Sequence, residues 1–166
     1  MKNIGIYPGT FDPITFGHID VIKKSLKFID KVVISISNAN DNQKNCLFTL
    51  KERIEIVKKA LFKDLKLSKN IIVIMAFDSL TTKLCEKYKS NIILRGLRAA
   101  SDFEYEFQLA GMNKKLNKNV ETIFLMSNVE NQIISSRLVK EIAKYKGKLN
   151  KFTTKSTIQS LKNKYA

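Results

Sequence analysis

The chain has 166 residues, of which 44% are hydrophobic. This hydrophobic fraction is enough to bury the core of one domain, which we predict to span residues 1–166. The chain is too short for two domains of ordinary size. Lys and Arg exceed Asp and Glu by 15 charges, which first suggests a polyanionic partner. Only four of the 30 cationic residues are Arg, although Arg is the side chain that most often contacts DNA bases. We therefore interpret most lysines as solvated surface and expect no nucleic-acid partner.

The chain also lacks the marks of a membrane or disulfide-bonded protein. Its longest apolar run, Ile71–Phe77, is far too short to cross a bilayer, and its first ten residues contain no apolar signal core. Cys46 and Cys85 lie far apart without a C-x-x-C pattern or a neighbouring His, so we expect two reduced thiols and no zinc site. These features predict a cytoplasmic protein with no membrane partner.

Strand-like and helix-like segments alternate along the chain. Short runs rich in Ile and Val predict buried strands at Ile4–Tyr7, Val32–Ile36, Ile71–Ala76, Ile92–Leu94 and Thr122–Met126. Helical spacing and capping residues, including capping boxes at Thr49/Glu52 and Ser101/Glu104, predict helices at His18–Ile29, Leu50–Leu61, Leu80–Tyr88, Ser101–Leu116, Arg137–Tyr145 and around Ile158, Leu161 and Tyr165.

This alternation predicts an α/β fold, a Rossmann-like doubly wound five-stranded parallel sheet in the order 3-2-1-4-5 with C-terminal helices. Ligands of such sheets bind outside the carboxyl ends of the strands, at the point where the strand order reverses. That point lies between the first and fourth strands. The segments that follow them, residues 8–18 and 95–101, are therefore expected to form the site, and residues 38–45 are a candidate loop over it.

The helix predicted to start at Ser101 carries apolar residues on two faces. We expect one face to cover the sheet, whereas the other needs a second cover, either a C-terminal segment of the same chain or another subunit. A second subunit is the preferred alternative. The face expected against the sheet contains Phe103, Phe107 and Ala110, and the opposite face contains Tyr105, Leu109, Met112 and Leu116.

The segment after the first strand has the composition of an anion site. Gly9, Gly17 and the prolines at positions 8 and 13 are expected to bend the chain and let its backbone approach a ligand. His18 then falls at the start of a helix, where a neutral imidazole is favoured over an imidazolium. A purely structural His is the alternative. The chain contains no P-loop, no G-x-G-x-x-G and no G-x-S-x-G motif.

The segment after the fourth strand holds half of the arginines. Arg95 and Arg98 flank Gly96, and two guanidinium groups at a strand end suit phosphates. The alternative is a structural pair between one of them and Asp102 or Glu104. Ser135 and Ser136, at a predicted helix start, offer hydroxyl and backbone N–H groups for a further phosphate, although such serines can also serve only as caps.

Two sequence blocks carry a resemblance to a known family. Gly9-Thr10-Phe11-Asp12-Pro13 followed by Thr15-Phe16-Gly17-His18 resembles the T/H-x-G-H motif of the nucleotidyltransferase superfamily, and Arg-Gly-Leu-Arg at 95–98 with Asp-Phe-Glu-Tyr-Glu at 102–106 is more specific. From Lys2 to its C-terminus the chain resembles the bacterial phosphopantetheine adenylyltransferases.

This resemblance implies reversible adenylyl transfer from ATP to 4′-phosphopantetheine, giving dephospho-CoA and pyrophosphate, the penultimate step of coenzyme A synthesis. It also implies a homohexamer. By analogy with phosphoryl transfer in general, we expect Mg²⁺ to be carried mainly by the ATP phosphates, with no metal held by the protein, because the motifs show no carboxylate cage. His18 would stabilise the transition state. The positions that would bind phosphopantetheine are Thr10, Lys44, Thr81 and Arg95. The positions that would bind ATP are Thr10, Phe11, His18, Gly96, Leu97, Arg98, Glu106, Asn131, Gln132, Ile133, Ile134, Ser135, Ser136 and Arg137.

The chain departs from the family pattern at Arg137, where the relatives carry a Ser, and we expect this cation either to contact an ATP phosphate or to point into solvent. A sister nucleotidyltransferase with another acceptor, such as nicotinate mononucleotide, is a second enzyme hypothesis. A basic nucleic-acid-binding module is an alternative from another class, but the chain has no RNP-like aromatic motif or zinc pattern. A scaffold would not need a glycine-containing loop that ends in His beside paired arginines.

Overall fold

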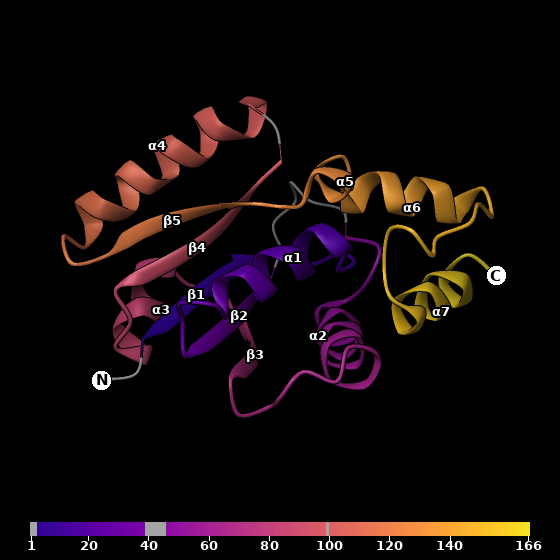
Figure 1. Cartoon of the computed structure of the whole chain (residues 1–166), viewed down its shortest axis with the longest axis horizontal. Helices are drawn as coiled ribbons and strands as arrows, with labels where there is room; N and C mark the ends of the chain where they lie inside the picture. Colours follow the sequence, from indigo (N-terminus) through magenta and orange to yellow (C-terminus); the bar gives the residue numbers. More distant parts are fainter. Residues whose placement is uncertain (1–2, 39–45, 99) are drawn as a thin grey trace.

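The computed structural model describes residues 3–38, 46–98 and 100–166, without the side chains of residues 100 and 101. Its centre is one five-stranded parallel sheet in the order β3-β2-β1-β4-β5 (Figure 1). This confirms the predicted fold and strand order. The strands are β1 (Ile4–Gly9), β2 (Lys31–Ser37), β3 (Ile72–Phe77), β4 (Ile92–Leu97) and β5 (Glu121–Met126).

Helices follow the strands much as the apolar spacing predicts. They are α1 (Phe16–Ser25), α2 (Leu50–Lys58), which continues as the π-helical turn η1 (Lys59–Asp64), α3 (Thr81–Tyr88), α4 (Ala100–Leu116), the short α5 (Val129–Gln132), α6 (Ser136–Lys144) and α7 (Lys155–Lys164). The helix predicted to reach Ile29 ends at Ser25, and α5 was not predicted. Within the described residues, no helix combines the length and apolarity that a membrane span requires.

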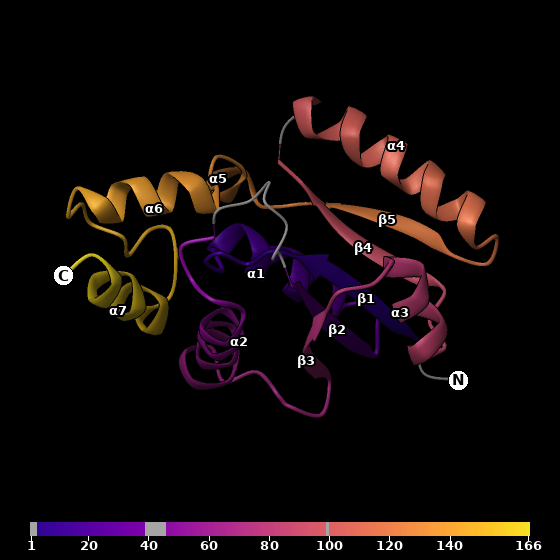
Figure 2. The same cartoon turned by 180° about the vertical axis from the view of Figure 1, so that it is seen from behind.

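The helices cover the two faces of the sheet unequally. On one face α1 and α2 lie over the sheet, and α3 lies over the other (Figures 1 and 2). The larger apolar cluster includes Ile22, Ile34, Val57 and Leu61, and the smaller one, around Leu84, has six buried members. Right-handed crossovers on either side of β1 place the helices in this way. The face of the sheet with the smaller apolar cluster leaves room for a cavity beside α4.

The pairing between β1 and β4 is unusually short. Backbone partners are aligned only at Gly5 with Ile92 and at Ile6 with Ile93, whereas β1 and β2 stay paired as far as Gly9. Beyond Ile6 the two central strands therefore separate toward their carboxyl ends. This separation opens the sheet at the predicted point of strand-order reversal.

The two faces of α4 differ from the predicted ones. Phe103 and Phe107 are 45% and 62% exposed, although Phe103 also contacts the ring of Phe124 on β5 at 6.0 Å between centroids. The more buried stripe instead contains Glu106 and Asn113, and it faces a cavity rather than an apolar sheet surface. The apolar spacing was misleading because the inner face of this helix lines a polar site. The predicted capping box at Ser101 involves a side chain outside the described part.

Candidate active site

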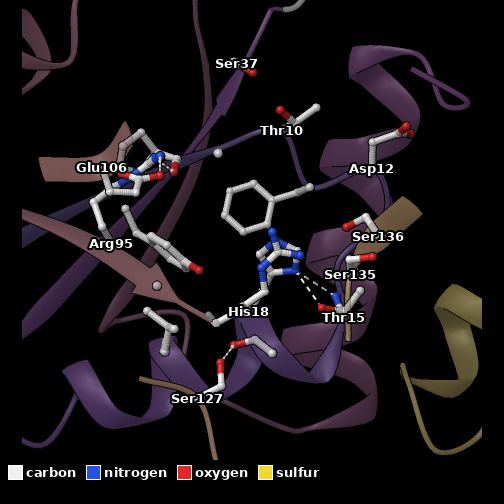
Figure 3. Close-up of a pocket in the computed structure, with 18 of the residues that line it drawn as sticks. Thr10, Asp12, Thr15, His18, Ser37, Arg95, Glu106, Ser127, Ser135 and Ser136 are labelled. Carbon is white, nitrogen blue, oxygen red and sulfur yellow. Dashed lines mark hydrogen bonds and ion pairs between the residues drawn. The ribbon is translucent and has the colours of Figure 1, made fainter. Parts of the chain in front are cut away.

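A cavity of about 910 Å³ lies at the carboxyl ends of the strands, between the separated β1 and β4 (Figure 3). Its volume falls in the range of sites for small molecules and cofactors. The lining comes from the β1–α1 loop, β4, α4 and the start of α6. The two segments singled out in the sequence, 8–18 and 95–101, thus contribute to the same cavity.

Most of the predicted site residues line this cavity. They are Thr10, Phe11, His18, Thr81, Arg95, Gly96, Arg98, Glu106, Ile134, Ser135, Ser136 and Arg137. Four others, Leu97, Asn131, Gln132 and Ile133, are not part of its lining. Asn131 instead donates from its amide to Asp20 on α1 at 2.7 Å, and Ile133 is 76% exposed. Lys44 lies outside the described residues.

The β1–α1 loop turns at a residue other than glycine. Phe11 has a φ of 51°, in the left-handed region that glycine usually occupies, whereas no glycine in the described chain has a positive φ. Gly9 is needed for another reason, since a Cβ there would lie 2.8 Å from the Phe11 ring. That ring is 1% exposed and meets Tyr7 edge-on at 5.4 Å between centroids. The loop therefore depends on packing around Phe11.

His18 lies in the middle of the cavity wall, in the first turn of α1 (Figure 3). The backbone N–H of Thr15 donates to His18 Nδ1 at 3.1 Å, and the Thr15 hydroxyl lies 2.9 Å from the same nitrogen. Because Nδ1 accepts a hydrogen bond, the proton of the neutral ring must be on Nε2. The ring thus has one N–H to donate, from Nε2.

The charge state of His18 follows from its surroundings. Burial, and secondarily the positive charge of Arg98, lowers the pKa of His18 from 6.5 to about 4. The imidazole is therefore neutral at neutral pH, as its position at a helix N-terminus led us to expect. It can stabilise a developing negative charge as a hydrogen-bond donor without first having to gain a proton.

Arg95 is fixed in place by its neighbours. It forms a two-point ion pair with Glu106 on α4, in which Nε lies 2.6 Å from Oε2, and its Nη1 donates to the carbonyl of Pro8 at 3.0 Å. The two side chains are 21% and 12% exposed. The carboxylate and the β1 carbonyl hold the planar guanidinium in one orientation. Arg95 thus joins β4, α4 and the carboxyl end of β1.

Arg98 lies in a more open setting. It pairs with Asp102 in the first turn of α4, at 3.1 and 3.3 Å, and its side chain is 43% exposed. This is one of the structural pairs that the sequence left open as an alternative for an arginine here. An exposed pair of this spacing is weak, so the guanidinium can exchange Asp102 for a phosphate at little cost.

The start of α6 closes another side of the cavity. Ser135 is the N-cap, and its Oγ accepts from the N–H of Leu138 at 3.2 Å. Ser136 Oγ donates to the carbonyl of Pro13 at 2.7 Å, which links α6 to the β1–α1 loop. Both hydroxyls thus have structural partners. The unpaired N–H groups that begin a helix still make this end of α6 favourable for an anion.

Asp12 is a cavity residue that we did not predict. Its carboxylate is 4% exposed and accepts from the N–H groups of Leu47 and Phe48, at 2.9 and 3.0 Å, and from Lys140 of α6 at 2.6 Å. It therefore joins the β1–α1 loop to α6 and to the segment that follows residues 39–45. These partners lie 35 to 128 positions away in the sequence, so spacing carried no sign of them.

Other unpredicted lining residues follow simple geometric rules. Ser37 and Phe77 stand at the carboxyl ends of β2 and β3, where the rule for parallel sheets places ligand contacts. Leu109, Ala110 and Asn113 share the helical stripe of Glu106. Spacing from Glu106 along α4 was the signal that could have found these three.

The sequence relatives place the chain in a family. A model of the cytidylyltransferase-like family matches residues 6–142. A phosphopantetheine adenylyltransferase of Pelagibacter ubique is 69% identical over 165 residues, 99% of both chains. A second, of Rhizorhabdus wittichii, is 47% identical and covers 95% of this chain and 91% of its own. The chain belongs to the phosphopantetheine adenylyltransferase family. This confirms the resemblance noted in the sequence and makes the protein a nucleotidyltransferase.

Solved structures of other nucleotidyltransferases share the fold of this family member. Plasmodium falciparum nicotinic acid mononucleotide adenylyltransferase, complexed with NaAD, superposes with a TM-score of 0.73 over 98% of this chain and 96% of its own, at 17% identity. A putative nicotinate-nucleotide adenylyltransferase from Vibrio parahaemolyticus gives 0.65 over 98% and 100%, at 20% identity. At these identities the match concerns the fold alone.

The cavity of this phosphopantetheine adenylyltransferase family member offers little to a resident metal ion. Its carboxylates Asp12 and Glu106 are both engaged, one by Lys140 and two N–H groups and the other by Arg95. Across residues 3–38, 46–98 and 100–166, no group of three or more His, Cys, Asp or Glu side chains is arranged to hold an ion. Mg²⁺ prefers free carboxylates and phosphates, so this donor set does not fit a metal bound by the protein alone.

Proposed function

We propose that this cavity is where the protein transfers an adenylyl group from ATP to 4′-phosphopantetheine, giving dephospho-CoA and pyrophosphate. Family membership at up to 69% identity over the whole chain supports this step of coenzyme A synthesis. The single observation that carries the site assignment is the convergence of a neutral His18 and two arginines on one cavity at the β1/β4 opening.

The acceptor supplies its own nucleophile, a phosphate oxygen, so no general base is required. The protein has to align this oxygen with the α-phosphorus of ATP and to balance charge in the pentacoordinate state. We assign the acceptor phosphate to Thr10 and Arg95, together with Lys44, and the pantetheine arm to Thr81. The fixed orientation of Arg95 supports this, because a guanidinium held by Glu106 has little freedom to lose on binding.

His18 is proposed to donate from Nε2 to the α-phosphate as negative charge develops on its oxygens. Its neutral state and its hydrogen bond from Thr15 support this role. The backbone N–H groups of Thr10 and Phe11 make no hydrogen bond to any described residue, and we assign them as donors to phosphate oxygens in the same cavity.

The β- and γ-phosphates of ATP are assigned to Arg98, the start of α6 and Arg137. The nucleoside is assigned to the other predicted ATP positions that line the cavity, Gly96, Glu106 and Ile134. Arg137 lines the cavity and is exposed, which supports a rim contact to phosphate over a side chain directed wholly into solvent. Mg²⁺ enters as part of the substrate, as the MgATP complex, because the donor set described above leaves its coordination to phosphate oxygens and water.

We propose that the protein self-associates through α4, as a homohexamer by analogy with its family. The outward face of this helix exposes Tyr105, Met112 and Leu116 by 66%, 59% and 56%. The alternative cover, the C-terminal segment, packs against α2, η1 and α6 instead (Figure 1). Sedimentation of Tyr105→Glu is expected to show smaller assemblies than the wild type. Phe28→Glu, at an exposed position outside α4, is the control, and equal sizes in the two variants would contradict the proposal.

A cytoplasmic location remains our proposal, supported by the free cysteines Cys46 and Cys85.

The direct test of function is pyrophosphate release from MgATP with 4′-phosphopantetheine as the acceptor. We expect release that depends on this acceptor and is absent with nicotinate mononucleotide. Release with nicotinate mononucleotide alone would favour the sister nucleotidyltransferase. No release with either acceptor, together with steeply salt-dependent binding to duplex DNA or RNA, would favour the nucleic-acid-binding module.

A further inference from the structure

Arg53 is a buried cation that neither the motifs nor the cavity lining includes. It lies on α2 and is 2% exposed. Its guanidinium donates to three backbone carbonyls: Nε to Phe48 at 3.2 Å, and Nη1 to Thr10 at 2.9 Å and to Ser37 at 3.0 Å. One side chain thus joins the ends of β1 and β2 and the segment before α2.

The charge of Arg53 has no carboxylate partner within 4 Å among the described residues. Burying a cation is costly, and here only carbonyl dipoles and charges farther away offset that cost. A neutral side chain would fill the same space without this cost. The three carbonyl contacts are therefore the evident reason for the cation.

Two of the three carbonyls belong to residues that line the cavity, Thr10 and Ser37, whereas Arg53 itself does not. The third belongs to Phe48, whose N–H donates to Asp12 of the same β1–α1 loop. The Thr10 carbonyl and the Phe11 N–H belong to the same peptide plane, so the contact from Arg53 to the carbonyl restricts the orientation of that N–H. The Phe11 N–H is one of the two groups assigned above to phosphate oxygens.

We propose that Arg53 is a positioning residue for adenylyl transfer, which sets the orientation of the Thr10 peptide and so the alignment of the acceptor phosphate. It acts through Thr10 and does not touch substrate. The inference rests on the proposed function, since Thr10 has to hold phosphate for its orientation to matter.

The test compares Arg53→Lys and Arg53→Gln with the wild type in the pyrophosphate-release assay. Neither side chain can contact three carbonyls in the planar arrangement of a guanidinium. We expect kcat to fall roughly 10- to 100-fold, as for small misplacements of a reacting group, with a smaller change in KM for ATP. Lys is expected to retain more activity than Gln, because it keeps the charge.

Thr49→Ala is the matched control. It removes the cap of the same helix, in which Thr49 Oγ1 accepts from the Glu52 N–H at 3.3 Å, and leaves the three carbonyl contacts in place. We expect it to lower the melting temperature while kcat stays within about twofold of the wild type. Equal losses of kcat in Thr49→Ala and Arg53→Lys would reduce Arg53 to a structural role and overturn the proposal.

A measurement on the wild type covers the case in which the Arg53 variants do not fold. The guanidinium protons of Arg53, observed by NMR, are expected to exchange slowly and to shift when 4′-phosphopantetheine is added. Signals that stay unchanged at saturating 4′-phosphopantetheine would overturn the proposal. An inactive wild-type protein would instead refute the proposed function, so the two failures are distinguishable.

Discussion

The two sides of the cavity are built in different ways. On the side of the β1–α1 loop, charged groups are buried, as Asp12 and Arg53 are, or only 21% exposed, as Arg95 is. Each of them is fixed by several partners. On the side of α6 and the start of α4, Arg98 and Arg137 are exposed, and Arg98 has a single exchangeable partner. We infer that the buried side holds and aligns the acceptor phosphate, and so governs kcat and the KM for phosphopantetheine. The exposed side governs the affinity for the ATP phosphates.

His18 is expected to show the largest effect on the buried side. His18→Ala removes the Nε2 donor and should cost at least ~2.7 kcal/mol of transition-state stabilisation, the size of one lost oxyanion donor. The affinity for ATP should change little. Steady-state kinetics measures the loss, and His18→Gln, whose amide can donate, should recover part of it. Turnover like that of the wild type in His18→Ala would refute the assignment.

Two carboxylate variants, one on each side of the cavity, test the difference between the sides through the free energy of unfolding. Asp12→Asn weakens the contact with Lys140 and the hydrogen bonds that the carboxylate accepts from two backbone N–H groups. It should lower the free energy of unfolding by about 2 kcal/mol. This is less than for a fully buried pair, because Lys140 is partly exposed. Asp102→Asn removes an exposed partner and should cost less than about 1 kcal/mol. Urea unfolding measures both. Equal losses would show that the two sides do not differ in this respect.

The two arginines on either side of Gly96 offer a matched kinetic pair. Arg95→Lys loses the two-point contact to Glu106 and should raise KM for phosphopantetheine about tenfold, equivalent to about 1.4 kcal/mol. Arg98→Lys keeps a mobile cation on the exposed side and should mainly raise KM for ATP, by a smaller factor. If Arg95→Lys instead raised KM for ATP, and Arg98→Lys raised KM for phosphopantetheine, the acceptor and ATP phosphates would have been assigned to the wrong arginines.

Arg137 should show a smaller effect still. Arg137→Ser restores the residue of the family pattern and should raise KM for ATP by only a few-fold, because an exposed charge contributes about 0–1 kcal/mol. Raising the ionic strength should reduce the difference between variant and wild type. An unchanged KM for ATP at low salt would mean that the side chain points into solvent.

Acid should weaken the fold in a defined pH range through His18. Its pKa of about 4 in the folded protein lies below its ordinary value of 6.5. Between these values the unfolded chain binds a proton that the folded protein does not, so the free energy of unfolding falls as the pH is lowered through this window. Above pH 6.5 the contribution is constant. Urea unfolding of the wild type and His18→Gln at several pH values should show a shallower fall in the variant.

Much of the fold could be predicted because it depends on local patterns. Near-continuous Ile and Val runs identify buried parallel strands, and the alternation with helices then restricts the strand order. The two faces of α4 were assigned wrongly because apolar spacing assumes an apolar partner. Here Glu106 and Asn113 face a polar cavity, while Phe107 lies 62% exposed.

The site could be predicted where motifs carry it and not where distant contacts do. His18 and Arg95 stand in recognisable blocks, and both line the cavity. Asp12 stands in one of these blocks and Arg53 in neither. The contacts of both were unforeseen, because their partners lie 35 or more positions away or are backbone carbonyls. The left-handed conformation of Phe11 was also unforeseen, since an aromatic residue with positive φ is imposed by packing around it and not by its own preference.

The short pairing of β1 with β4 has a consequence for cooperativity. Only two aligned residue pairs join the β3-β2-β1 half of the sheet to the β4-β5 half along the backbone. Past Ile6 and Ile93 the two central strands have no aligned backbone pairs, and the Arg95 side chain joins them through the Pro8 carbonyl. A ligand that contacted both strands would add a second connection. We therefore expect bound substrates to hold the two halves of the sheet together. Saturating ATP should then raise the melting temperature and also make the thermal unfolding transition narrower.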